Sequence, residues 1–391
     1  MAAAAVALIS CTNEETVDVD DSGTIKFRAV MGAGANSRGI ETKTENLNEF
    51  MVCAVVRGQA EHYIEQQKFE RIAFNEDGTA QFSSKNVYRW PENCTVDFYA
   101  YSYYPGKDGD KDNEIDYKKL GVKLSTEDDG SEDDGSEDHN SGDHTISFSP
   151  DQDITKQIDP VTAWNCGSEH TSSMGVVLEF HHILSQIQIK ALSSNSIYKF
   201  QILGARIANV KSEGGTWNIA NKTWTGIKST LGTYAITQSK EPEPLTATAV
   251  SIIGDDNPAM LLPQSLTGWD PTKVKEVDGT KVVDSDGAYI SVLLRITMNN
   301  TSGDHVVFPD PKAKYTKIKD NGDNEYAWAN IPISTVWESG KRYIYTLNFM
   351  SGAGYDDEGE KILGDQISFT TTVKAWESKP TNLQDVANGN K

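Results

Sequence analysis

Residue types that could support catalysis occur in this sequence, but not at the spacings that catalytic motifs require. Gly32 and Gly34 are followed by Ser37, where a dinucleotide-binding fingerprint would place a third glycine. The chain contains no Walker loop, no Gly-x-Ser-x-Gly elbow and no His-Glu-x-x-His pair. Seven histidines are scattered along the chain, and nothing singles out a pair among the 57 carboxylates. We therefore expect no enzymatic activity and no cofactor.

Cys11 lies in a setting that predicts a covalent modification. Residues 1–11 read Met-Ala-Ala-Ala-Ala-Val-Ala-Leu-Ile-Ser-Cys, and polar residues follow. This run is shorter than the ~20 residues that span a bilayer, but it has the length of a signal-peptide apolar region. Its end resembles a bacterial lipobox, in which the cysteine thiol is acylated and that cysteine becomes the N-terminus. No Lys or Arg precedes the run, so either the true start lies upstream or the leader is an incidental Ala-rich segment.

The other cysteines predict neither a disulfide framework nor a metal site. Cys53, Cys94 and Cys166 are an odd number at wide spacing, without a Cys-x-x-Cys pair or a Cys/His pairing of zinc type. Cys53 and Cys94 lie in apolar alternations, where a free cysteine usually behaves as a small buried hydrophobe.

The pair His181-His182 stands at a change of pattern. Apolar positions are even before it, as in Leu178 and Phe180, and odd after it, as in Ile187. A period-2 strand cannot switch faces without an extra residue or a break, so we expect a bulge or a strand end at the pair. A metal site there would need a third ligand that the sequence does not offer nearby, which favours a structural role.

Residues 126–144 form an acidic block of repeated five-residue units. The block carries nine carboxylates and no Lys or Arg, which predicts a solvated loop between strands. Calcium binding is an alternative, because Asp108, Asp110 and Asp112 lie just upstream. That run departs from a calcium loop, since Asn113 replaces the glycine at its sixth position and Lys119 the glutamate at its twelfth.

Composition and net charge limit the classes of protein to which this chain can belong. The 391 residues carry 36 Lys and Arg against 57 Asp and Glu, a net charge of −21. Phosphate backbones and anionic lipid surfaces repel such a chain, which excludes nucleic-acid binding and leaves a lipid anchor as the expected link to a membrane. A content of 15 Tyr, 12 Phe and 8 Trp is too aromatic for a disordered acidic chain. The length predicts two or three folded domains.

Hydrophobic periodicity predicts strands along most of the chain. Ile25, Phe27 and Ala29 alternate with charged residues, and the same period of 2 recurs at 96–100, 176–180, 187–189, 290–296, 343–349 and 367–373. Turn dipeptides such as Asp77-Gly78 and Asp278-Gly279 separate the runs. This pattern is typical of all-β proteins built from antiparallel sandwiches.

The chain resembles the fimbrillin family of anaerobic Gram-negative bacteria, whose members are lipoprotein precursors that mature into subunits of adhesive surface pili. The resemblance covers roughly 350 residues and rests on short segments in the family's order. These are the lipobox at Cys11, Ile25-Lys-Phe-Arg-Ala-Val30, Ser37-Arg38-Gly39, Asn48-Glu-Phe-Met-Val52, Tyr88-Arg-Trp-Pro91, Val96-Asp-Phe-Tyr-Ala-Tyr101, Tyr104-Pro105, Gln157-Ile-Asp159 with Ala163, Val177-Leu-Glu-Phe-His181, Leu262-Pro-Gln264, Gly340-Lys-Arg-Tyr-Ile-Tyr345 and Val373-Lys-Ala-Trp376.

The resemblance implies two transthyretin-like β-sandwich domains in tandem. We expect a lipoprotein signal segment at 1–11, a flexible linker at 12–23, an N-terminal domain at 24–173 and a C-terminal domain at 174–391. Export as a lipoprotein would bring the precursor to the outer membrane and the cell surface. The implied partners are other pilin subunits in a homo- or hetero-polymer, an Arg-specific maturation protease and a host or bacterial surface receptor.

The family's assembly mechanism implies roles for three segments. The first strand, with Ile25, Phe27 and Ala29, would be removed after cleavage in the loop that follows it, and a strand from a neighbouring subunit would fill the groove. Arg38 is the expected cleavage site, because it lies among Gly, Ala, Asn and Ser, whereas Arg28 lies inside the strand. The candidate donor strand is 367–376, where the side chains of one face are Ile367, Phe369, Thr371, Val373 and Ala375.

Two alternatives remain open from the sequence. Residues 367–376 could be the last strand of the second domain, in which case the subunit is a tip or accessory one or donates another segment. The protein could also be a surface lipoprotein that binds glycans without polymerising. Exposed aromatic platforms would then be required, and Trp217, Trp224, Trp269 and Trp328 are the available residues.

Overall fold

The computed structural model describes residues 23–31, 42–59, 61–104, 115–124, 144–172, 174–237, 242–254, 257–300, 303–364 and 367–376. Within these ranges the chain is built from strands and two short 3-10 helices, η1 (Tyr117–Leu120) and η2 (Ile154–Lys156), which confirms the all-β prediction. None of the helices in this part of the chain has the length and apolarity that crossing a membrane requires.

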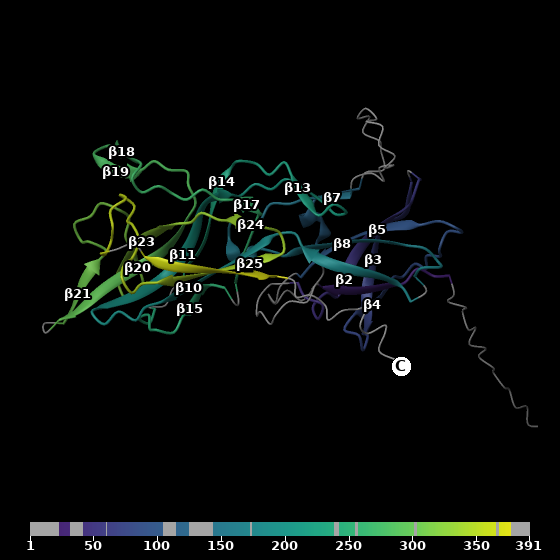
Figure 1. The fold of residues 1–391 in the computed structure, drawn as a ribbon, viewed down its shortest axis with the longest axis horizontal. Coiled ribbons are helices and arrows are strands. Elements are labelled where there is room, and N and C mark those ends of the chain that lie inside the picture. Colours follow the sequence, from purple (N-terminus) through teal and green to yellow (C-terminus); the bar gives the residue numbers. More distant parts are fainter. Residues whose placement is uncertain are drawn as a thin grey trace, which may run out of the picture.

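The N-terminal half forms a closed barrel of seven strands at one end of an elongated molecule (Figure 1). Its interior is filled by alternate, inward-facing side chains of every strand, as the period of 2 predicts. The strands in barrel order are β1 (Phe27–Met31), β4 (Ala80–Ser83), β3 (His62–Phe74), β2 (Glu49–Val56), β5 (Val96–Tyr103), β8 (Pro160–Gly167) and β9 (Val176–His182).

The C-terminal half is a sandwich of two sheets around a second core (Figure 1). One sheet has the order β15 (Val250–Ile253), β10 (Ser185–Leu192), β25 (Lys341–Asn348) and β26 (Ser368–Ala375), with β16 (Ala259–Leu261) also paired to β10. The other has the order β14 (Leu231–Thr237), β11 (Tyr198–Lys211), β20 (Tyr289–Asn300), β23 (Glu325–Pro332) and β22 (Ile318–Lys319), with β21 (Gly303–Phe308) also paired to β20.

Smaller sheets complete the fold. One of them joins the two halves, because its strands come from both: β13 (Thr223–Thr225), β12 (Thr216–Asn218), β7 (His144–Ser147) and β6 (Val122–Leu124). It covers a third core on the outer face of the barrel. The remaining pairs are β17 (Gln264–Ser265) with β24 (Val336–Trp337) and β18 (Val274–Val277) with β19 (Thr280–Val283).

The β18–β19 hairpin shows why the turn dipeptides were informative. Asp278 and Gly279 both have positive φ, 49° and 72°. A two-residue hairpin turn with positive φ at both central positions matches the twist of the flanking strands, and Asp-Gly is a preferred pair there.

Two pairs of strands are parallel, whereas the sequence predicts antiparallel pairing. One of these pairs extends the first domain beyond its expected end. β1 runs parallel to β9, and β10 runs parallel to β25. β9 belongs to the barrel, since it pairs with β1 and β8, although the expected division places residues from 174 onward in the second domain. The chain passes from barrel to sandwich after His182, where β9 ends, and the next strand, from Ser185, pairs with β16 and β25. The predicted break at the histidine pair is therefore confirmed as a strand end.

Candidate functional site

The first strand closes the N-terminal barrel. β1 pairs with β4 on one side, where Phe27 lies opposite Phe82, and with β9 on the other, where Phe27 lies opposite Val176. Just before β1 the chain is held by backbone bonds from Ile25 N–H to the Tyr88 carbonyl and from Trp90 N–H to the Gly23 carbonyl. β4 and β9 meet only through β1 in the barrel order. Removal of β1 would therefore leave both neighbours with an unpaired edge.

The inward side chains of this segment are part of the barrel core. The exposed fractions of Ile25, Phe27 and Ala29 are 6%, 1% and 0%, which agrees with the face predicted from the sequence. The ring of Phe27 is edge-on to those of Phe69 and Phe98, with centroids 4.7 and 5.1 Å apart. Burial of one large apolar side chain stabilises a fold by about 1.5–3 kcal/mol. The segment therefore fills a groove lined by aromatic and aliphatic side chains.

The outward face of β1 carries a partly exposed ion pair. Nη1 of Arg28 lies 3.2 Å from Oδ2 of Asp77, in the turn between β3 and β4. Burial tends to raise the pKa of the Asp77 carboxyl, but bonds from the Thr79 hydroxyl and N–H and the charge of Arg28 outweigh it, so the pKa is lowered overall. Arg28 is thus held within the strand, as the sequence predicts.

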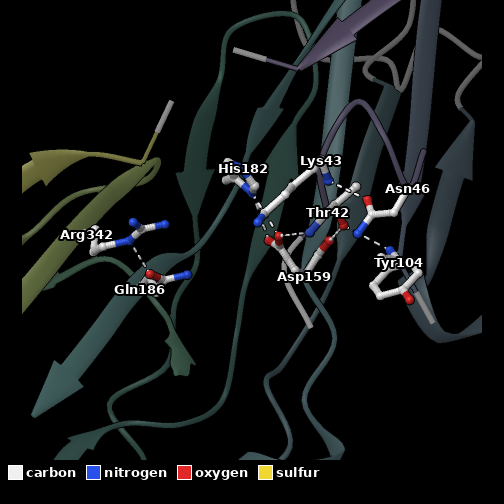
Figure 2. Close-up of polar contacts among 8 residues, drawn as sticks. All are labelled: Thr42, Lys43, Asn46, Tyr104, Asp159, His182, Gln186 and Arg342. Atoms are coloured by element: carbon white, nitrogen blue, oxygen red, sulfur yellow. Dashed lines mark hydrogen bonds and ion pairs between the residues drawn. The ribbon is translucent and has the colours of Figure 1, made fainter. Parts of the chain in front are cut away.

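The chain is fixed again at Thr42, on the far side of residues 32–41, which lie outside the described part. The N–H of Thr42 donates to Oδ2 of Asp159 and its hydroxyl donates to the Asp159 carbonyl, both at 2.8 Å (Figure 2). The Thr42 hydroxyl also accepts a 2.9 Å bond from the N–H of Tyr104. Thr42 and Asp159 are buried. Thr42 is therefore held by Asp159 and Tyr104, which do not belong to β4 or β9, the two strands that pair with β1.

Asp159 also holds the end of β9. Its carboxylate lies 2.9–3.0 Å from Nδ1 of His182, and both side chains are buried (Figure 2). The ring of His182 stacks on the indole of Trp376, with centroids 4.0 Å apart and 5° between the planes. His182 therefore has the structural role expected of it. Trp376 follows β26, so these contacts join the start of the segment after residue 41 to the end of the last described strand.

The candidate donor strand is an edge strand in this structure. β26 pairs along its whole length with β25, with Phe369 opposite Leu347 and Val373 opposite Tyr343. Every residue of β26 is exposed, including 36% of Phe369 and 53% of Val373. Thr371 and Ala375 are exposed as well, whereas Ile367, just before the strand, is 8% exposed. The flanking residue Trp376 is fully buried.

Several of the predicted site residues lie outside the described ranges. These are Cys11 with the whole signal segment, the linker up to residue 22, Arg38, the aspartates of 108–112 and the acidic block as far as residue 143. His144, the last residue of that block, is the first residue of β7. The tail from 377 onward also lies outside.

The four tryptophans that a glycan platform would need are packed against other groups. Trp217 and Trp269 are 2% and 6% exposed. Trp224 lies against Trp217 with 56° between the ring planes, and its Nε1–H donates to the Ile183 carbonyl. Trp328 lies under the guanidinium of Arg206, 4.2 Å from its ring centroid. These side chains do not form an exposed coplanar surface.

The family comparison agrees with the sequence resemblance. The family model described as fimbrillin-like matches residues 35–376. The chain belongs to the fimbrillin-like family. Members of this family are structural rather than enzymatic, associate with other pilin subunits, and act in fimbriae at the cell surface. No curated protein matches the fimbrillin-like chain.

Solved structures of similar length align with the fimbrillin-like chain. A fimbrilin of Porphyromonas gingivalis W83 is 10% identical, with a TM-score of 0.42 and coverage of 92% of this chain and 98% of that one. A candidate cell adhesion protein of Bacteroides ovatus ATCC 8483 is 14% identical, with a TM-score of 0.41 and coverage of 90% and 97%. The family assignment rests on the family model rather than on these alignments.

The contacts around Asp159 were not identified from the sequence as a site. The segment Gln157-Ile-Asp159 was noted only for its likeness to the family, and Trp376 only as part of a terminal motif. The pairing of Thr42 with Asp159 joins residues 117 apart, which no local pattern reveals.

Proposed function

We propose that this fimbrillin-like chain is a structural subunit of an adhesive cell-surface fimbria. In this proposal it is exported as a lipoprotein acylated at Cys11, matured by an Arg-specific protease that cuts after Arg38, and polymerised when a strand of a neighbouring subunit replaces β1. The polymer contains copies of this chain or related pilins, and the assembled fimbria binds a host or bacterial surface receptor.

The position of β1 is the observation that carries this proposal. β1 lies between β4 and β9, so its departure would open the barrel there and expose an apolar groove. An incoming strand would restore both rows of backbone hydrogen bonds and refill the pockets of Ile25, Phe27 and Ala29. Because Thr42 is held by Asp159, the rest of the subunit keeps a fixed point beyond the cleaved connection.

The order of side chains in β26 supports it as the donor. The first segment reads Ile25-x-Phe27-x-Ala29-x-Met31, and the last reads Ile367-x-Phe369-x-Thr371-x-Val373. Both therefore present an Ile, a Phe, a smaller residue and a larger apolar one in the same chain direction. A strand that enters the groove in the orientation of β1 would place Phe369 where Phe27 lies, edge-on to Phe69.

To act as a donor, β26 must first separate from β25 of its own subunit. Its exposed side chains lose little buried area when it separates from β25, so its ladder of backbone bonds and the contacts of Ile367 and Trp376 hold most of it in place. If β26 instead stays as the last strand of the sandwich, the subunit is a tip or accessory one or donates another segment.

Limited digestion of the purified chain with an Arg-specific protease tests the proposal. Intact mass should show one early cut after Arg38, and size exclusion followed by SDS gels should show resistant oligomers. The variant R38A should stay uncut and monomeric, while R89A, which changes an exposed arginine whose backbone pairs with that of Thr24, should behave like the parent. A cut chain that stays monomeric contradicts self-polymerisation, and resistance of Arg38 in a folded chain contradicts the cleavage assignment.

A further inference from the structure

Three potential metal ligands meet between the barrel and the small sheet that joins the two halves. Cys53 on β2, His62 at the start of β3 and His144 at the start of β7 each offer one ligand atom, and these atoms all lie within 4.8 Å of one another. Sγ of Cys53 is 3.3 Å from Nε2 of His144. Cys53 and His144 are buried and His62 is half-buried.

Irregular pairing of β2 with β3 brings His62 to this face. The register places Ala54 opposite Ile64 but Val55 opposite His62, so β3 contains an extra residue at Tyr63. Without this bulge His62 would share the face of Ile64, which points into the barrel core. With it, His62 lies on the outer face together with Cys53. Bulges commonly redirect a side chain next to a functional site.

Aromatic packing holds the ligand rings in place. The ring of Tyr99 stacks on His144, with centroids 3.8 Å apart and 8° between the planes. Tyr99 is also the cross-strand neighbour of Cys53 on β5. The ring of His62 stands edge-on to His144 at 5.6 Å. A site whose ligands are oriented by their surroundings binds a metal with less reorganisation.

One further feature of the cluster points to a cation. Nε2 of His62 is buried and has no hydrogen-bond partner, and such an atom in a folded protein calls for a ligand or an ion. A bound cation would supply a partner for this nitrogen.

We propose that Cys53, His62 and His144 bind one zinc ion. One sulfur and two imidazole nitrogens are a ligand set that Zn²⁺ prefers, with a fourth position left for water or a further ligand. Tetrahedral bonds of about 2.0–2.3 Å put ligand atoms roughly 3.3–3.6 Å apart, so ligand atoms that lie up to 4.8 Å apart must approach by at most about 1.5 Å. The half-buried His62 is the ligand best able to move.

A zinc ion bound by these three residues would link β7 to β2 and β3. β7 pairs with β12, which lies in the second half of the chain, so the ion would strengthen the joint between barrel and sandwich. This inference is independent of cleavage, strand exchange and fimbrial assembly.

The test uses the full chain, stripped with a chelator and then titrated with Zn²⁺ by calorimetry and with Co²⁺ by absorbance. We expect one tight equivalent, a thiolate-to-cobalt charge-transfer band and a rise in the unfolding temperature with Zn²⁺. H62A and H62Q should lower the affinity at least about 100-fold and remove the temperature rise. H170A, which changes an exposed histidine, should bind like the parent.

Two results would overturn the assignment. One is a Co²⁺ spectrum without the charge-transfer band, since Cys53 would then not be a ligand. The other is equal Zn²⁺ affinity in the parent and both His62 variants, as expected if only the acidic residues of 127–143 capture the ion. Circular dichroism of the His62 variants shows whether they fold, and the use of two variants separates lost ligation from a local packing defect.

Discussion

The indole of Trp376 lies flat on the imidazole of His182, with ring centroids 4.0 Å apart. This contact joins the end of the last described strand to the end of β9, the barrel strand that pairs with β1. The carboxylate of Asp159 contacts Nδ1 of the same His182 ring and also accepts a bond from the N–H of Thr42. The two segments that strand exchange would have to release, β1 and β26, therefore end beside one shared group of contacts.

Truncation of Trp376 should loosen β26. Because the indole is fully buried, W376A should destabilise the chain by about 3–5 kcal/mol. Amide hydrogen exchange in residues 368–375 should quicken more than exchange in β25 and β10. W164A, at a tryptophan that is 37% exposed, is the control and should leave exchange in β26 unchanged. Unchanged exchange in W376A would show that the ladder to β25 alone holds the strand.

The side chain of Phe27 should contribute to the stability of the uncut chain but not to that of the polymer. F27A should destabilise the uncut chain by about 3–5 kcal/mol, because the side chain is 1% exposed and lies among aromatic rings. Chemical unfolding of uncut chains measures this loss, and V87A, at a residue 74% exposed, should change stability by less than about 0.5 kcal/mol. Polymers made from F27A should be as stable as those of the parent, since β1 has left them. A less stable F27A polymer would mean that β1 stays.

The Asp77–Arg28 pair should make β1 sensitive to acid. The pKa of Asp77 is lowered in the folded chain, so its stabilising contribution is full above the unfolded value of about 3.9 and is lost as pH falls through the folded value. The two side chains are about a fifth exposed, so the contribution is about 0.5–1 kcal/mol. Urea unfolding should show D77N less stable than the parent at neutral pH, and the difference should shrink as pH falls below the unfolded value of about 3.9. A constant difference across this range would contradict the assignment.

Neighbouring residues of β26 should differ in their effect on assembly. Phe369 and Thr370 are both exposed in the uncut subunit, so F369D and T370D should both fold. In the groove left by β1, Phe369 would point into the barrel and Thr370 out of it, since strand side chains alternate. F369D should abolish SDS-resistant oligomers, while T370D should reduce them little. Equal effects of the two variants would mean that β26 does not enter the groove.

The local part of the fold was predictable from the sequence. Alternation in residues 25–29 gave the buried face of the first strand, and the change of parity at His181-His182 gave the end of β9. Both follow from the period of 2, which depends only on neighbouring residues. The assignment of β9 to the barrel was missed because it depends on pairing with β1, about 150 residues earlier in the chain.

The clusters around Asp159 and Cys53 could not be read from the sequence. His144 is 91 residues from Cys53, and the spacing shows no metal motif. His62 joins them through a bulge at Tyr63, which no turn residue or proline marks. Side chains brought together by long-range pairing and by an irregular register leave no periodic signal.

The fate of the β1 peptide after cleavage tests the central claim most directly. Native mass spectrometry of the protease-treated chain, before and after oligomers form, measures whether the peptide that ends at Arg38 remains bound. The account predicts that it accompanies the cut monomer and is absent from the oligomers, and that an excess of synthetic peptide 24–31 slows their formation. Oligomers that retain one β1 peptide per subunit would contradict the replacement of β1 by a neighbour's strand.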